Sequence, residues 1–252
     1  MLECVRHGVQ RFQQERDCGQ VRRVDVTPDA DLRLVAALLH TVSNRSYGEA
    51  YRQAAGLDEA GRREVVTTSM RHMELYDAML REFEHVGCTF EVSLSAACFG
   101  QLKRHRMMTL TAQSYDPALG LTIPPAVRAA GFADEVRSLA SRAEELSLRI
   151  GAASPAAAPY ALLNAHRRRA LVSVNARELY HVSRLREDQH AQWDIRVLAG
   201  EMVNQAREVM PLTLLLAGGK DAYAQRYTEV YGEPPKVGSP TLPGANVPCG
   251  AG

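Results

Sequence analysis

Residues 87–106 read GCTFEVSLSAACFGQLKRHR, and the spacing of the apolar side chains changes within this stretch. Every second residue from Phe90 to Leu94 is apolar, which is typical of a strand with one buried face. The run from Ser95 to Leu102 has a helical pattern instead, and it leads into the cations of Lys103–Arg106. A strand followed directly by a helix indicates an α+β chain, with an unusual basic cluster where the helix ends.

The remaining chain predicts long helices and few strands in one domain at 21–231. Residues 161–174 fit either a strand or a helix, and both interpretations stay open. We expect a short helix or an arm at 1–20 and a flexible Pro- and Gly-containing tail at 232–252. The other expected elements are an edge strand at 21–26, a helix that starts at Thr27-Pro28-Asp29 and runs through Leu39, a loop with a short helix at 47–61, a helix at 62–85, a β-like segment at 107–114, a helix at 129–150 and a long helix at 176–209.

The composition excludes several classes of protein. Hydrophobic residues make up 46% and charged residues 23% of the 252 residues, which excludes extended disorder for most of the chain. No apolar run approaches the length of a membrane span, and residues 1–7 have no secretory apolar core, so we expect a cytoplasmic protein. The net charge of +1 disfavours a protein that binds nucleic acid through bulk electrostatics.

The cysteines and histidines suggest neither a metal site nor a disulfide framework. The five cysteines are scattered and form no Cys-x-x-Cys pair, so we expect reduced thiols. The eight histidines form no compact ligand motif, which makes a metal enzyme the least favoured class.

Two segments carry residues suited to an anionic ligand. Arg104, His105 and Arg106 are three consecutive potential cations whose mutual repulsion an anion would relieve, although a solvated helix end also explains them. Arg177, His181 and Arg184 are spaced four and three residues apart, so they share one face of a helix. Neighbouring acidic residues are the alternative explanation for this second set.

Together, the two segments resemble the signatures of the flavin-dependent thymidylate synthases, the ThyX family. The family pattern of Arg-His-Arg, seven residues and Ser is similar to Arg104–Arg106 followed by Ser114. Its second block, Asn-x-Arg and then His-Ala-Gln-Trp-Glu/Asp-Ile, is similar to Asn175–Arg177 and His190–Ile195. Phe83–His85 is a third, weaker match, and the resemblance covers roughly residues 21–215.

The resemblance implies long helices that flank a small mixed β-sheet in a homotetramer, with FAD and dUMP at the subunit interfaces. It implies reductive C5-methylation of a uracil nucleotide, with methylenetetrahydrofolate as the carbon donor and NADPH as the reductant. No nucleophilic cysteine takes part in the family's reaction, so the absence of a cysteine motif is no objection.

The resemblance also assigns site residues. Arg186 is expected to stabilise negative charge that develops on the uracil, as a preorganised cation. The residues expected to bind the flavin are Arg81, Arg104, His105, Arg106, Asn175, Arg177 and His181. The residues expected to face the nucleotide are Gln101, Arg104, Gln113, Ser114 and Arg186.

The chain departs from the family pattern where the family binds the nucleotide phosphate. Ala112 replaces a Glu, Asp116 replaces a phosphate-binding Arg, and a second such Arg falls near Pro159. Two lost charge-assisted contacts would weaken dUMP binding by roughly 100-fold. The cluster Arg167–Arg169 either replaces the missing cations or forms a solvated face, and the second interpretation is favoured. We therefore expect a divergent member that acts on dUMP, UMP or another acceptor.

Two other classes stay open beside the enzyme. The missing Glu and Arg are also consistent with a non-catalytic or assembly homologue that has lost nucleotide binding. The basic residues of 103–106 and 166–169 are consistent with nucleic-acid binding, against which the near-neutral net charge argues.

Overall fold

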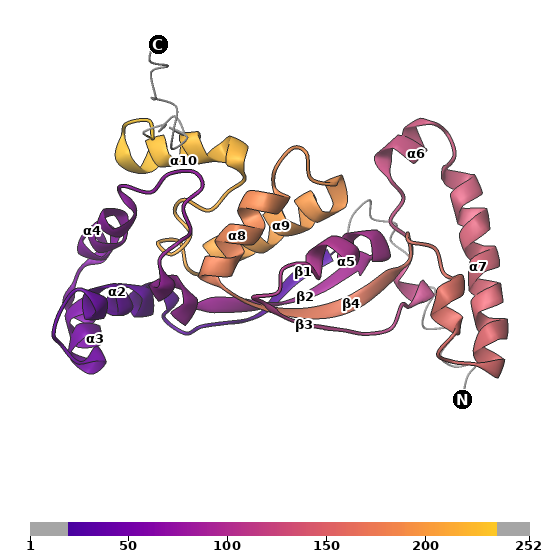
Figure 1. Ribbon diagram of the computed structural model, residues 1–252, viewed down its shortest axis with the longest axis horizontal. Coiled ribbons are helices and arrows are strands. Elements are labelled where there is room, and N and C mark those ends of the chain that lie inside the picture. Colours follow the sequence, from indigo (N-terminus) through magenta and orange to yellow (C-terminus); the bar gives the residue numbers. More distant parts are fainter. Residues whose placement is uncertain (1–19, 236–252) are drawn as a thin grey trace, which may run out of the picture.

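The computed structural model describes residues 20–235 (Figure 1). The expected arm at 1–20, except Gln20, and most of the expected tail lie outside this range. The strands are β1 (Gln20–Val26), β2 (Gly87–Ser95), β3 (Thr109–Ala112) and β4 (Arg167–Asn175). The α-helices are α2 (Ala30–Thr41), α3 (Tyr47–Gly56), α4 (Glu59–Met70), α5 (Ala96–Leu102), α6 (Pro125–Ala129), α7 (Ala133–Ala153), α8 (Ala176–Arg186), α9 (Trp193–Arg207) and α10 (Lys220–Tyr231). Short 3₁₀ helices are η1 (Arg81–His85), η2 (Pro117–Leu119) and η3 (Ala158–Ala161). The α+β class is confirmed.

The four described strands form one sheet in the order β1-β2-β4-β3. All three pairings are antiparallel, so the expected mixed sheet is wrong in this respect. β1 lies at an edge of the sheet, as expected, and the open question at 161–174 is answered by a strand, β4. Strand formation at β4 is favoured because Ala170, Val172 and Val174 alternate with exposed residues and complete the buried face of β2.

The helices cover one face of the sheet and both of its ends. Figure 1 shows α5, α8 and α9 above the sheet, α2 to α4 beyond one end and α7 beyond the other. The core lies between the sheet and α8 and α9, where Phe90, Val172, Leu179, Ile195 and Leu198 are buried. Within residues 20–235, no helix combines the length and the apolar composition needed to cross a membrane.

The helix expected at 62–85 is wrong beyond Met70. α4 ends there, residues 71–80 follow an irregular path, and only η1 at 81–85 is helical. The hydroxyls of Tyr223 and Tyr227 on α10 donate to the carbonyls of Met73 and Arg71, each over 2.6 Å. Because these carbonyls bond to side chains from another part of the chain, the helix does not need to continue to satisfy them.

The single long helix expected at 176–209 is two helices. α8 ends at Arg186, and α9 begins at Trp193. Between them, the Asp188 carboxylate accepts from the His190 backbone N–H over 2.8 Å, and Gln192 caps α9. Local side-chain hydrogen bonds of this kind compete with the backbone hydrogen bonds of a helix, and they interrupt the helix here.

The predicted start of the first helix is also wrong by a few residues. Thr27 does not cap this helix, because its hydroxyl and amide bond to Gly87 of β2. α2 begins at Ala30, after Asp29 in a left-handed conformation with φ of 50°. The segment expected to be mainly loop at 47–61 holds α3 and the start of α4, whereas the strand expected within 107–114 and the helix expected at 129–150 are confirmed as β3 and α7.

Candidate functional site

His105 is buried at the centre of a network of hydrogen-bonded polar side chains that joins the end of α5 to α8. Its Nδ1 lies 3.3 Å from Oε1 of Glu178, and Nε of Arg186 lies 2.9 Å from its Nε2. A guanidinium nitrogen can only donate, so Nε2 of His105 accepts and the ring proton lies on Nδ1, facing the Glu178 carboxylate. The two neighbours therefore fix both the orientation and the tautomer of the ring.

Glu178 is held in place by the start of its own helix. Asn175, the last residue of β4, caps α8, because its side-chain oxygen accepts from the Glu178 backbone N–H over 2.8 Å. This cap is the favoured arrangement for an Asn at a helix N-terminus. Glu178 is buried in the first turn of α8.

Arg186, at the other end of α8, extends this hydrogen-bonded network toward α5. Nη1 of Arg186 donates to the side-chain oxygen of Gln101 over 3.2 Å, and Gln101 in turn contacts Gln192. Burial lowers the pKa of Arg186, and the nearby charge of Arg104 lowers it further. A half-buried cation of this kind is an attractive site for an anion or a polarised carbonyl, since either would offset the cost of burying its charge.

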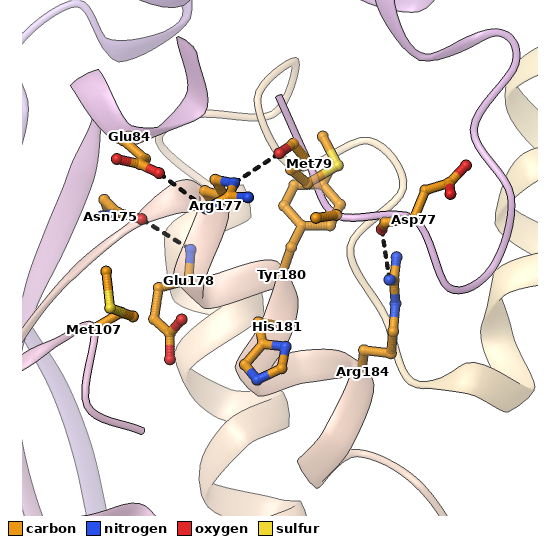
Figure 2. A pocket seen from close by; sticks show the side chains of 11 residues that line it. Asp77, Met79, Glu84, Met107, Asn175, Arg177, Glu178, Tyr180, His181 and Arg184 are labelled. Carbon is orange, nitrogen blue, oxygen red and sulfur yellow. Dashed lines mark hydrogen bonds and ion pairs between the residues drawn. The ribbon is translucent and has the colours of Figure 1, made fainter. Parts of the chain in front are cut away.

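A cavity of about 200 Å³ opens beside this network, over one face of α8 (Figure 2). Arg177, Glu178, His181 and Arg184 project from α8 toward it, and Met107 closes one side. The His181 ring also contacts the His105 ring edge to face, with 5.7 Å between the ring centroids. The cavity therefore borders the buried His105.

Two arginines of α8 anchor the irregular segment 71–80 along the cavity. Nε of Arg177 donates to the Met79 carbonyl over 2.7 Å, and its Nη1 donates to Glu84 over 3.0 Å. Nη1 of Arg184 donates to the Asp77 carbonyl over 2.6 Å, and burial lowers the pKa of Arg184. Figure 2 shows the contact of Arg184 with Asp77 on the side of α8 opposite Met107. These two arginines hold the cavity wall in place, so only their remaining N–H groups are available to a ligand.

The structure brings together six of the residues expected in the site. Each of the six either belongs to the hydrogen-bonded network around His105 or lines the cavity: Gln101, His105, Asn175, Arg177, His181 and Arg186. Arg81 is exposed and pairs with Glu84 over 2.9 Å, at the edge of the same region. Arg104 and Arg106 are exposed, and within residues 20–235 their side chains make no hydrogen bond or ion pair.

Gln113 and Ser114 lie away from the cavity in this single chain. They follow β3, and the Gln113 amide donates to the carbonyl of Arg169, near the start of β4. Asn175 ends the same strand, so about six residues, or roughly 20 Å of strand, separate the two places. The expectation that these residues share one site with Arg186 stays a prediction.

The cluster at 167–169 is not the solvated face that the sequence favoured. Arg167 is fully buried, and its Nε donates to Thr122 over 2.8 Å. The Arg168 guanidinium lies between the Phe99 and Tyr115 rings, 4.6 and 4.5 Å from their centroids. Only Arg169 is exposed. The Thr122 hydroxyl accepts from Arg167 and aromatic rings contact Arg168, and these partners are all distant in the sequence.

Several site residues were missed by the sequence analysis. Glu178 was not singled out, although an acid three residues after an Asn cap is a recognisable first-turn signal. Glu84 and Arg184 were noted in motifs but not assigned to the site. Asp77 and Met79 gave no signal, because their segment was taken for part of a helix. Within residues 20–235, no three His, Cys, Asp or Glu side chains are grouped to hold a metal ion.

Comparisons with known proteins point to one family. The sequence model of the family described as "Thymidylate synthase complementing protein", Thy1, matches residues 23–212. A flavin-dependent thymidylate synthase of Geobacter sulfurreducens is 34% identical over 145 residues, which cover 54% of this chain and 62% of the relative. A flavin-dependent thymidylate synthase of Haloarcula marismortui is 27% identical over 231 residues, which cover 77% of this chain and 92% of that protein. The chain thus spans about three fifths of the first relative.

A solved structure shows the same fold. The UMP/dUMP methylase PolB from Streptomyces cacaoi, bound with 5-Br dUMP, superposes with a TM-score of 0.66 at 20% identity. The match covers 81% of this chain and 97% of PolB.

Proposed function

Because the chain belongs to the thymidylate synthase complementing protein (Thy1) family, we propose that it is a flavin-dependent enzyme that methylates C5 of a uracil nucleotide. The observation that carries the proposal is the contact between the two motif blocks. His105 of the first block accepts from Arg186 of the second over 2.9 Å, and Glu178 fixes the opposite side of the ring. Such a prearranged cation is what charge stabilisation on a uracil ring requires.

Arg186 is the proposed catalytic residue. Its contacts with His105 and Gln101 fix the plane of the guanidinium before any ligand arrives. A cation that is already oriented needs no reorganisation when negative charge develops on the uracil carbonyl. Gln101 holds Arg186 in this role and places its own amide at the edge of the same region.

The exposed donors of this region fit a phosphate-bearing flavin. Arg104 and Arg106 have guanidinium groups without hydrogen-bond or ion-pair partners in the described part of the chain, and His181 presents an exposed ring. We propose that these three hold FAD, with Arg81 at the edge, while Asn175 and Arg177 shape the cavity through bonds within the chain. When bound, the flavin supplies hydride transfer, with NADPH as its reductant and methylenetetrahydrofolate as the carbon donor.

The proposed site is completed by another copy of the chain. A cavity of about 200 Å³ is small for a dinucleotide, and Gln113 and Ser114 lie roughly 20 Å of strand from Asn175. A homotetramer in which Gln113 and Ser114 of one copy face the cavity of another would unite the expected residues.

The acceptor is proposed to be dUMP, UMP or a related uracil nucleotide. Asp116 stands where the family has a phosphate-binding Arg, and its carboxylate accepts from the Ala118 amide over 2.9 Å. A carboxylate fixed in this way repels a phosphate. Arg169 is the exposed cation nearest to Gln113 in the sheet register, so we assign phosphate contact to it in place of the missing Arg.

A spectroscopic titration tests the proposal. The purified chain is titrated with FAD, and then with dUMP and with UMP, while the flavin absorption is recorded. We expect flavin binding, a further spectral change with one nucleotide, and a C5-methylated product when the carbon donor and NADPH are added. Arg186→Ala should keep flavin binding and lose methylation, whereas Arg63→Ala, on the exposed face of α4, should change neither.

The outcomes separate this proposal from a non-catalytic assembly protein, which the replacement by Asp116 also favours. A chain that never binds FAD but still self-associates is that assembly homologue. Flavin binding without any response to either nucleotide would reject the uracil acceptor. Methylation that survives Arg186→Ala would reject the role given to this residue.

A further inference from the structure

An apolar groove lies between α2, α4 and the residues just before η1, at the end of the molecule opposite α7 (Figure 1). Its volume is about 620 Å³, which is within the usual range of ligand-binding sites. Val42 and Leu80 are 81% and 41% exposed there, so the described chain leaves part of the apolar lining uncovered. We call it the α4 groove; its apolar lining consists of Leu38, Leu39, Val42, Leu57, Val65 and Leu80.

The α4 groove also carries two carboxylates that the described chain does not neutralise. Glu64 of α4 and Glu82 of η1 line it, and within residues 20–235 neither side chain has a hydrogen-bond or ion-pair partner. None of the described lining residues is a lysine, an arginine or a histidine. An occupant that combines apolar side chains with a positive charge would therefore match the groove in both respects.

The end of α10 lies against α4. Tyr231, the last residue of α10, donates its hydroxyl proton to the Thr67 carbonyl of α4 over 2.7 Å. Thr68, the next residue of α4, lines the α4 groove, and Pro235, where the described range ends, follows Tyr231 by only four residues. An extended segment of ten residues spans roughly 33 Å, whereas the whole of α4 spans roughly 18 Å. Residues 236–252 therefore begin within reach of the groove.

Residues 1–19 join the described chain farther from the α4 groove. They precede Gln20, which pairs with Ser93 near the end of β2. α2 follows the opposite end of β1, where Val26 pairs with Cys88. The seven residues of β1 place roughly 23 Å of strand between these two ends. The chain after α10 is therefore the nearer source of an occupant.

We propose that residues 236–247 of the same chain dock in the α4 groove. This segment reads KVGSPTLPGANV, and Lys236 is its only charged residue. Lys236 supplies the cation that Glu64 and Glu82 lack. It opens the segment, so it enters the groove from the side where α10 ends.

The apolar residues of the segment match the lining of the groove. Val237, Leu242 and Val247 cover the lining that the described chain leaves exposed, and they lose their own contact with water. The two prolines within the segment restrict the undocked chain, which reduces the entropy lost on docking. The inference goes beyond the proposed function, because docking within one chain needs neither flavin nor nucleotide.

The labelling rate of a cysteine placed in the groove tests the docking. Thr68→Cys is introduced into the full chain, and its reaction with iodoacetamide is followed by peptide mass spectrometry. The rate should be about 10-fold lower than in the same chain with Val237→Ser, Leu242→Ser and Val247→Ser, since these serines remove the apolar contacts. The matched control is Arg63→Cys, which is exposed on α4 outside the groove and should react equally fast with both tails.

Charge reversal tests the contact of Lys236 with the groove. Protection is the ratio of the Thr68→Cys rates with the triple-Ser tail and with the intact tail, so that changes in intrinsic thiol reactivity cancel. Lys236→Glu, present with both tails, should lower this ratio about fivefold, and Glu82→Lys added to it should restore part of the loss. An unchanged ratio in Lys236→Glu would overturn the proposal.

Equal rates for Thr68→Cys with the two tails would also overturn the proposal. If both rates are as fast as that of Arg63→Cys, nothing covers the groove. If both are slow, another occupant covers it: a second copy when the rate depends on protein concentration, and residues 1–19 or a bound molecule when it does not. Far-UV circular dichroism of every variant verifies that the helices are intact.

Discussion

Nε of Arg186 lies 2.9 Å from Nε2 of His105, so a side chain at the end of α8 donates to a buried side chain just after α5. The two residues are 81 positions apart in the sequence. Their contact makes the histidine an acceptor toward Arg186 and a donor toward Glu178. The site is therefore a connected unit in which a change at one residue alters the geometry of the others.

Arg186→Lys tests whether charge alone is sufficient. Lysine keeps the positive charge but lacks the planar fork that contacts His105 and Gln101 together. We expect turnover to fall by about 10²-fold, with flavin affinity nearly unchanged. Steady-state assays and flavin titration measure the two effects, with Arg63→Lys as the matched surface control. Full activity in Arg186→Lys would show that the fork is dispensable.

Glu178 should contribute to stability through the histidine it faces. Glu178→Ala leaves the buried Nδ1–H of His105 without its acceptor, which should lower the free energy of unfolding by about 1–3 kcal/mol. Glu178→Gln retains an acceptor oxygen, so it should cost clearly less. Urea denaturation of the two variants measures the difference. Equal losses for Ala and Gln would mean that the hydrogen bond is not the source of the stability.

Gly87 is required where β2 passes the end of β4. A Cβ at this position would lie 2.4 Å from the Val174 carbonyl oxygen and 2.8 Å from Cα of Asn175, both of which are backbone atoms. Gly87→Ala should therefore destabilise the fold by about 1–3 kcal/mol and disturb the Asn175 cap.

The matched control for this change is Gly100→Ala in α5, where nothing lies within 4 Å of the added carbon. This variant should be neutral or stabilised by up to about 1 kcal/mol, because Ala favours helix over Gly. Thermal unfolding of both variants provides the comparison. A Gly87→Ala protein as stable as wild type would contradict the close approach of the two strands.

The thiols of Cys88 and Cys98 should be inert in the folded protein. Burial raises the pKa of Cys88 to about 11 and raises that of Cys98 further. Since the thiolate is the reactive form, about one Cys88 thiol in 10³ is ionised at pH 8. Peptide mass spectrometry after iodoacetamide treatment at pH 8 should find both residues unlabelled, and both labelled after denaturation. Labelling in the native state would show that the core opens there.

The same pKa shift has a consequence for stability at alkaline pH. The ordinary pKa of 9.0 applies to the unfolded chain, so unfolded thiols lose their protons before the buried ones. Their contribution to stability is present below pH 9 and declines as the pH rises above it. A Cys88→Ala variant should lose less stability than wild type between pH 8 and pH 10, as measured by urea denaturation. An identical pH dependence would contradict burial as the cause.

Much of the fold follows from local patterns. The alternation at 90–94 and the helical spacing at 132–150 predict β2 and α7, because each pattern places apolar side chains on one face. The errors at 71–80 and 187–192 have one cause. At 71–80 apolar residues keep a helical spacing, and the segment 187–192 lies between two runs of apolar residues with helical spacing, while hydrogen bonds that Tyr223 and Tyr227 donate and that Asp188 accepts end the helix. Two of these three donors or acceptors belong to a distant part of the chain, so the local pattern does not reveal them.

The sequence by itself determined the family pattern of the site. Residues such as Arg104–Arg106 and Asn175–Arg177 occur at fixed spacings, which can be read directly from the sequence. The tertiary structure alone decided which of these residues meet. It buries His105 between Glu178 and Arg186, stacks Arg168 between two aromatic rings, and leaves Ser114 at the far end of β4 from Asn175. The physical reason is that burial, hydrogen-bond partnership and the direction of a side chain are set by strand register and helix packing, which join residues far apart in the sequence.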